Sequence, residues 1–306
     1  MLAFDSNTAE AMSHSTFPLD PQPNEFRVKF WGVRGNIPTP GKDTMRFGGN
    51  TACVEVRVDG KRLIFDAGTG LRVLGKYLRP SMPFSAHLFF THTHWDRIQG
   101  FPFFLPAFVK GNSFTIYGAT GPNGASMKQR LCDQMLIPNF PVPLQEMQAD
   151  LEFNDIRPGS IIPVGDVAIE TISLNRPHSA LGYRITWNGY SVVYATDTHH
   201  EAGELDQGLL YLSQKADLLI YDAFYTDHIY CGDEGAENRP ELWKTGIELA
   251  IAAEVKQVLL FHHDPEHDDA FLEQVEQEIQ QQFPNVALAR EGMVVTLCEE
   301  KTAAEG

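Results

Sequence analysis

Short apolar runs separated by polar loops dominate this chain. The runs are rich in Val, Ile, Phe and Tyr and are bounded by Gly, Asp, Asn or Pro, a pattern typical of β-strands. They lie at residues 26–32, 52–58, 62–66, 86–91, 114–118, 166–174, 182–187, 191–196, 217–222, 257–263 and 293–298. The pattern therefore predicts strands along the whole length of the chain.

Helical periodicity appears between and after these runs. Apolar residues recur every three or four positions at 240–254 and 269–283, and more weakly at 126–136 and 203–215. Strands in both halves with helices between them indicate an α/β protein with sheets inside and helices outside. We expect one domain at 26–299, with a Pro-rich insertion at about 119–150, a polar N-terminal tail at 1–25 and a C-terminal tail at 300–306.

Composition narrows the functional classes. The 306 residues carry a formal charge of −16, which argues against non-specific binding of nucleic acid because phosphates need a basic partner surface. No stretch approaches the roughly 20 apolar residues that span a bilayer. The first residues lack the basic start and apolar run of a signal peptide, and the four cysteines are scattered. We therefore expect a cytoplasmic protein with no membrane partner.

Chemistry-bearing residues gather where the predicted strands end. Five of the apolar strands end in such residues, namely Asp66, the segment Thr91–Asp96, Asp197, Asp222 and the pair His262–His263. In layered α/β proteins, ligands bind just outside such strand ends. His and Asp together are preferred ligands of zinc, iron and manganese. The pattern favours a metal site over packing.

The segment after the fourth predicted strand is the most specific feature. His92, His94 and Asp96 alternate, and alternate side chains of an extended segment point the same way. The three are therefore expected to converge on one metal ion. A polar turn without function is the alternative, but three alternating ligand types after a buried strand make it the weaker one.

These residues are part of a wider resemblance. THTHWDRIQGFPFF resembles the His-x-His-x-Asp-His-x-x-Gly motif of the metallo-β-lactamase superfamily. The resemblance extends over most of residues 27–298. It is carried by the segments WGVRGNIPTPG, RFGGNTACVEV, LIFDAGTGLRVLG, YATDTHH, LLFHHDPEHDD and AREGMVV. They are similar to the branch that contains ribonuclease Z and cyclic-nucleotide phosphodiesterases. The resemblance implies a four-layer αββα sandwich and hydrolysis by a metal-bound water.

The resemblance also implies roles for individual residues. One metal would take His92, His94 and a His from the loop after the next sheet, and Asp197 would bridge to a second metal. That second metal would take Asp96, a His directly after it, and a late His that matches His263. Asp96 would also act as the catalytic carboxylate. A further carboxylate, Asp66, would stand beside the metal ligands without touching the metal.

This chain departs from the family pattern at three positions. Arg97 stands where the family has the His after Asp96, and Arg176 replaces the third His of the first metal. Pro240 stands where the family often has a His that assists proton transfer. His178 lies close enough to Arg176 in sequence to act as a substitute ligand or to contact substrate.

The two arginines change the expected metal content. A guanidinium stays protonated and has no lone pair to donate. At about 4 Å from a divalent cation it would be repelled by roughly 8 kcal/mol, taking an effective dielectric constant of 20. Each arginine can instead pair with a carboxylate or grip a substrate phosphate. We expect one divalent metal, zinc or else iron or manganese, with a metal-free site as the alternative.

Two functions follow from this site. One is a phosphodiesterase-like hydrolase with an atypical, mononuclear centre. The other is a catalytically silent member of the family whose arginine-containing cleft binds a nucleotide or other small anionic ligand as a sensor. The run Phe101, Phe103 and Phe104 is expected to belong to the core, or else to form a wall for an aromatic base. A homodimer is expected from the resemblance.

Overall fold

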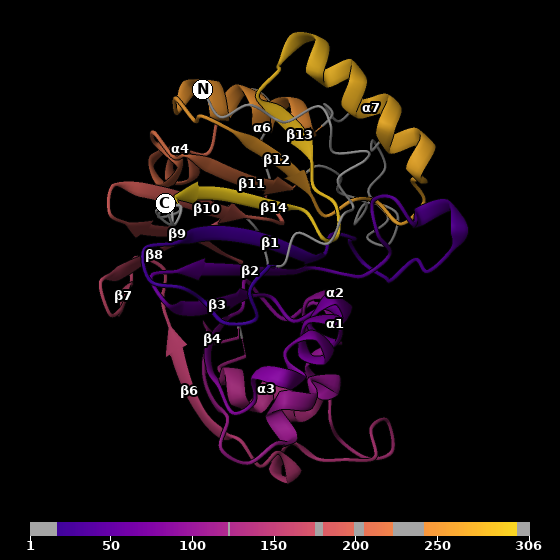
Figure 1. The fold of residues 1–306 in the computed structure, drawn as a ribbon, viewed down its shortest axis with the longest axis vertical. Coiled ribbons are helices and arrows are strands. Elements are labelled where there is room, and N and C mark those ends of the chain that lie inside the picture. Colours follow the sequence, from indigo (N-terminus) through magenta and orange to yellow (C-terminus); the bar gives the residue numbers. More distant parts are fainter. Residues whose placement is uncertain (1–16, 122, 175–179, 199–204, 223–241, 299–306) are drawn as a thin grey trace, which may run out of the picture.

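Two β-sheets form the centre of the protein. The computed structural model describes residues 17–121, 123–174, 180–198, 205–222 and 242–298. Within these residues, the first sheet has the strand order β14-β1-β2-β3-β4-β5-β6 and the second β13-β12-β11-β10-β9-β8-β7. Helices cover the outer face of each sheet (Figure 1), which gives the four-layer αββα sandwich that the sequence predicted.

The strands of the first sheet are β1 (Phe26–Gly32), β2 (Cys53–Val58), β3 (Lys61–Phe65), β4 (Ser85–Phe89), β5 (Ser113–Ala119), β6 (Asp150–Ile156) and β14 (Val294–Cys298). Those of the second sheet are β7 (Ile161–Val164), β8 (Val167–Ser173), β9 (Leu181–Trp187), β10 (Tyr190–Ala195), β11 (Leu218–Asp222), β12 (Val258–Phe261) and β13 (Val286–Leu288). The helices are α1 (Thr69–Tyr77), α2 (Trp95–Ile98), α3 (Met127–Asp133), α4 (Gln207–Ser213), α6 (Leu242–Ala252) and α7 (Asp269–Gln282), with short 3-10 turns between them.

Three hydrophobic clusters hold the layers together. One lies between the sheets and includes Phe30, Phe65 and Tyr194. A second packs α1 and the segment after α2 on the first sheet, and a third packs α4, α6 and α7 on the second. Among the described residues, no helix combines the length and apolar character that a bilayer-spanning segment needs.

The predicted strands are present, with ends that differ by no more than two residues. The apolar pattern does not predict β6, β7, β13 or the helices α1 and α2. In β6 most side chains are partly or fully exposed, so the strand carries no strong apolar signal. In the segment expected to be an insertion, residues 119–150, the structure has the helix α3 and a 3-10 turn at Leu144–Glu146.

Part of the segment expected to be an N-terminal tail packs on the first sheet. The backbone carbonyls of Pro18 and Leu19 accept hydrogen bonds from Arg57 and Arg62, which are both buried. The same two guanidinium groups pair with the buried carboxylate of Glu55. Residues from Phe17 onward therefore complete a buried polar network. Without these carbonyl groups, the buried guanidinium groups would lack hydrogen-bond partners, which would lower the stability of the fold.

Candidate metal centre

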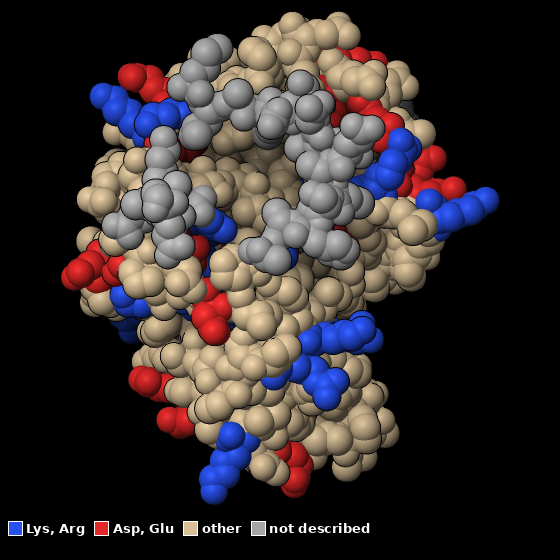
Figure 2. Space-filling model, viewed as in Figure 1, with Lys and Arg blue, Asp and Glu red and all other residues tan. Residues whose placement is uncertain are grey.

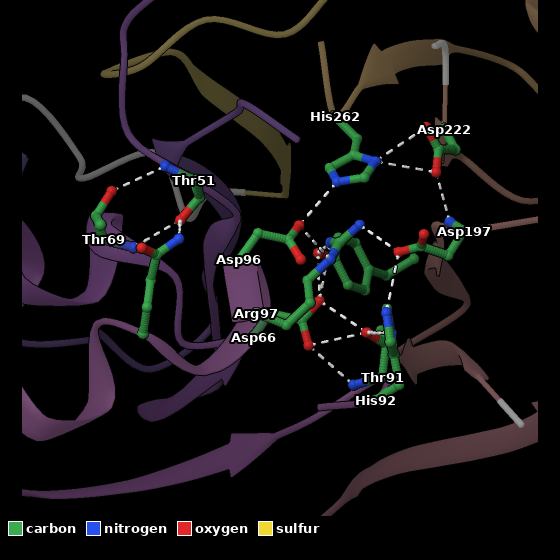
Figure 3. A network of polar contacts seen from close by, with 12 residues as sticks. Thr51, Asp66, Thr69, Thr91, His92, Asp96, Arg97, Asp197, Asp222 and His262 are labelled. Carbon is green, nitrogen blue, oxygen red and sulfur yellow. Dashed lines mark hydrogen bonds and ion pairs between the residues drawn. The ribbon is translucent and has the colours of Figure 1, made fainter. Parts of the chain in front are cut away.

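Polar side chains from both sheets meet at the edge where five strands end. Asp66 follows β3, and His92 and His94 follow β4 of the first sheet. From the second sheet, Asp197 follows β10, Asp222 ends β11, and His262 follows β12. Figure 3 shows the side chains of Asp66, His92, Asp197, Asp222 and His262 pointing toward one another between the two sheets.

His92, His94 and Asp197 form one cluster that suits a metal ion. Each offers a ligand atom, and these atoms lie within 4.8 Å of one another. His92 Nε2 is 3.5 Å from Asp197 Oδ2, and among the described residues it has no hydrogen-bond partner. Burial lowers the pKa of His92 to about 3, so its imidazole is neutral near pH 7. A buried nitrogen lone pair facing a carboxylate fits a divalent cation.

Neighbouring hydroxyl and carboxylate groups fix the tautomer of His92. Thr91 Oγ1 lies 3.0 Å from both carboxylate oxygens of Asp66, to which it donates its proton. The same oxygen lies 3.0 Å from His92 Nδ1 and can then only accept from it. His92 therefore carries its proton on Nδ1 and presents the lone pair of Nε2 to Asp197. This is the arrangement that metal-binding histidines use.

Arg97 lies in the middle of the site and is completely buried. Its Nη2 donates to Asp197 Oδ2 at 2.6 Å, and its Nη1 donates to Asp66 Oδ2 at 3.1 Å. Nε is 3.3 Å from Asp96 Oδ2, and Nη1 also reaches the hydroxyl of Tyr194. Burial opposes the charge, but Asp197 and its other acidic neighbours outweigh it and raise the pKa of Arg97. One guanidinium thus contacts three carboxylates (Figure 3).

His262 provides a second buried cation beside Arg97. Its Nε2 lies 2.9 Å from Asp96 Oδ2, and its Nδ1 lies 3.2 Å from Asp222 Oδ2. Burial and Arg97 disfavour its protonation, but Asp222 and Asp197 outweigh them and raise the pKa of His262 to about 10. Asp197, Asp222 and His262 also offer ligand atoms within 4.8 Å of one another. A metal ion at this second cluster would have to displace the proton of His262 and lie beside Arg97, which donates to Asp197.

Unusual backbone geometry aims several of these side chains. Asp66, Asp197 and His262 all have positive φ angles, 58°, 61° and 65°, which is uncommon for residues other than glycine. The backbone amide of Asp197 donates to Asp222 Oδ2 at 2.6 Å, which holds that turn. A Cβ at Gly35 would lie 2.7 Å from His262 Nε2, so only glycine allows the imidazole to lie there.

The structure corrects two of the predicted positions. His263, predicted as the late metal ligand, instead bonds through Nε2 to the backbone oxygen of Ala289 at 2.7 Å, and its neighbour His262 reaches the site. Asp96 does not converge with His92 and His94, because α2 begins at Trp95 and ends the extended alternation. Asp222 and His262 are site residues that we noted at the predicted strand ends without assigning a role to either.

The remaining predicted residues fall into three groups. His92, His94 and Asp197 lie together, and Asp66 lies next to them through Thr91. Arg97, which we expected to pair with a carboxylate or to grip a substrate phosphate, is engaged by carboxylates. Arg176, His178 and Pro240 lie outside the described residues.

Comparisons with known proteins support the fold. Residues 61–263 match the family model of the beta-lactamase superfamily domain. The chain is 33% identical over 128 residues to ribonuclease Z of Haloarcula marismortui, an alignment that covers 40% of this chain and 38% of that protein. Ribonuclease Z of Haloferax volcanii is 25% identical over 285 residues, covering 78% of this chain and 84% of that protein.

A solved structure gives the same fold. A diphosphatase from the PhnP family superposes with a TM-score of 0.63 at 16% identity, over 90% of this chain and 98% of that one. Together with the two seven-stranded sheets, the helices outside them and the polar residues at their shared edge, these matches establish the family. The chain belongs to the metallo-β-lactamase superfamily.

Proposed function

We propose that this chain is a hydrolase that uses one divalent cation, held by His92, His94 and Asp197, to cleave a small phosphodiester. Two histidines and one carboxylate suit zinc, iron or manganese and leave coordination positions open. The tautomer of His92 and its unpartnered Nε2 support this ligand set. When bound there, the cation would supply Lewis acidity toward a water and a substrate oxygen.

The observation that carries the proposal is the position of Arg97. Its guanidinium contacts Asp66, Asp96 and Asp197, the carboxylates that the resemblance places around two metals. Counting Asp222 as well, four carboxylates face two cations, Arg97 and protonated His262, which leaves two negative charges. One divalent cation balances that remainder, whereas a second would leave an excess of positive charge beside Arg97.

The other residues of the site then have defined tasks. Asp66 and Thr91 hold the His92 imidazole, and Arg97 keeps Asp197 in place. Asp96 lies between two cations; burial opposes its ionisation, but Arg97 and His262 lower its pKa to about 2. So acidic a carboxylate is a poor proton acceptor. These contacts favour charge compensation by Asp96 over the catalytic role that the resemblance implied.

The proposed substrate class rests on the relatives and on the surface. The matched proteins are named as ribonuclease Z and as a diphosphatase, so a phosphorus ester is the substrate that the likeness favours. On the described part of the face in Figure 2, Lys and Arg form separate groups and no continuous basic track. With a formal charge of −16, this favours a small ester over a long nucleic acid.

A silent binding protein is the second candidate. It is favoured by the engagement of Asp96 and Arg97 with each other, because neither side chain is then available to substrate. In that case the site would bind a nucleotide or other anion without turnover.

Metal content tests the one-cation site. Wild-type protein purified without chelator is expected to contain about one divalent metal per chain, by elemental analysis. Arg97→His replaces the guanidinium by a ligand beside Asp96, Asp197 and His262, and we expect its metal content to rise toward two. Arg72→His, on the exposed face of α1, is the matched control and should stay at one. Two metals in the wild type, or none, would contradict the proposal.

Thr91→Val tests the tautomer argument. The substitution keeps the shape of the side chain but removes the hydroxyl that accepts from His92 Nδ1. Loss of such a partner typically weakens metal affinity by about 10- to 100-fold. Competition with a chromogenic chelator measures this affinity. Thr115→Val, on β5, should have no effect, and an unchanged affinity in Thr91→Val would show that the hydroxyl does not orient the ligand.

Turnover separates the hydrolase from the silent binding protein. Zinc-, iron- and manganese-loaded protein should cleave bis-p-nitrophenyl phosphate or a cyclic nucleotide, and Asp197→Asn should abolish both cleavage and metal binding. Absorbance of released p-nitrophenol measures the rate. Fully metal-loaded wild type without turnover on these esters would refute the hydrolase proposal and leave the binding protein.

A further inference from the structure

Trp95 is a large exposed aromatic residue beside the proposed metal ligands. It stands between His94 and Asp96, and 61% of its side chain is exposed. By contrast, Trp31 and Trp187 are 7% and 8% exposed, and Trp243 is partly buried against the third hydrophobic cluster. Single exposed apolar residues are ordinary, but among those that the structure describes Trp95 is the one next in sequence to a proposed metal ligand.

The helix α2 begins at Trp95, directly after the proposed ligand His94. Asp96, Arg97 and Ile98 are buried, and successive helical residues point about 100° apart, so the indole turns away from the interior. His94 is the least buried of the three proposed ligands. Trp95 stacks on no other ring among the described residues.

The neighbouring phenylalanines do not offer the same surface. Phe101 and Phe104 are 1% and 0% exposed and belong to the core. For these two residues the core prediction is confirmed, and they do not form a wall for an aromatic base. Phe103 is exposed, but its ring packs against Phe140 at a centroid distance of 5.5 Å. Trp95 is therefore the aromatic side chain of this segment that is available to a ligand.

We propose that Trp95 is a stacking platform for an aromatic group of the substrate, a nucleobase or aryl ester, whose phosphate binds at His92, His94 and Asp197. The inference rests on the proposed function for the position of the phosphate. Stacking on an indole accepts any base, since every base has a π-face. It also needs no charged partner, which suits a site whose arginine and histidine cations are already engaged by carboxylates.

Paired ligands that differ only by an aromatic group test this platform. Calorimetry on zinc-loaded protein compares phenyl phosphate with methyl phosphate, and adenosine 5′-monophosphate with ribose 5-phosphate. We expect the aromatic member of each pair to bind about tenfold more tightly, as one base–aromatic stack allows. Trp95→Leu should reduce this preference to about one, whereas Trp95→Phe should keep most of it. Phe103→Leu is the matched control and should leave it unchanged.

Two further readouts separate stacking from damage to the site. Zinc content and methyl phosphate affinity should be the same in all variants. Binding of adenosine 5′-monophosphate should quench the tryptophan fluorescence of the wild type but not that of Trp95→Phe, because the other tryptophans lie buried or half-buried.

The outcomes distinguish this inference from the proposed function. An equal preference in wild type and Trp95→Leu, or no binding of any of the four phosphates, would overturn the platform. Turnover of phosphodiesters without an aromatic preference would overturn it as well and leave the hydrolase standing. An aromatic preference that depends on Trp95, in a protein without turnover, would support the platform and refute only the hydrolase.

Discussion

A buried guanidinium among carboxylates is the interaction on which the site depends. Arg97 is wholly inside the protein, where an unpaired charge would be very costly, and it is stabilised by Asp66, Asp96 and Asp197. The carboxylates depend equally on Arg97, because it supplies positive charge that metals would supply in the dinuclear pattern. We propose that the charge of this one side chain limits the number of metal ions that the site can hold.

The fold supplies the geometry for this arrangement. Two sheets end at one edge, and residues with positive φ within two positions of the ends of β3, β10 and β12 turn their side chains into the gap. Asp222 links two of these turns, since it accepts from the Asp197 amide and contacts His262. Local backbone strain is thus balanced by hydrogen bonds within the site, as is common where function requires fixed groups.

Much of the fold and part of the site could be predicted from the sequence. The apolar runs located most strands because buried strands must be apolar, whereas the exposed β6 gave no such signal. The strand ends predicted the correct edge of the sheets for the site. They do not indicate which of the adjacent residues His262 and His263 faces that edge. That choice depends on the positive φ of His262, which turns it inward while His263 bonds to Ala289. Likewise, α2 begins at Trp95, so the Asp96 side chain does not point the same way as His92 and His94. The alternating sequence pattern alone does not show where this helix begins.

In the proposed site, Arg97 excludes a second metal while His92, His94 and Asp197 retain one. Anomalous diffraction from crystals grown with excess zinc can test this proposal. We expect one strong peak within coordination distance of His92 Nε2 and Asp197, with the Arg97 guanidinium still on Asp197 and Asp96. A second peak between Asp96 and His262, with Arg97 displaced, would contradict it.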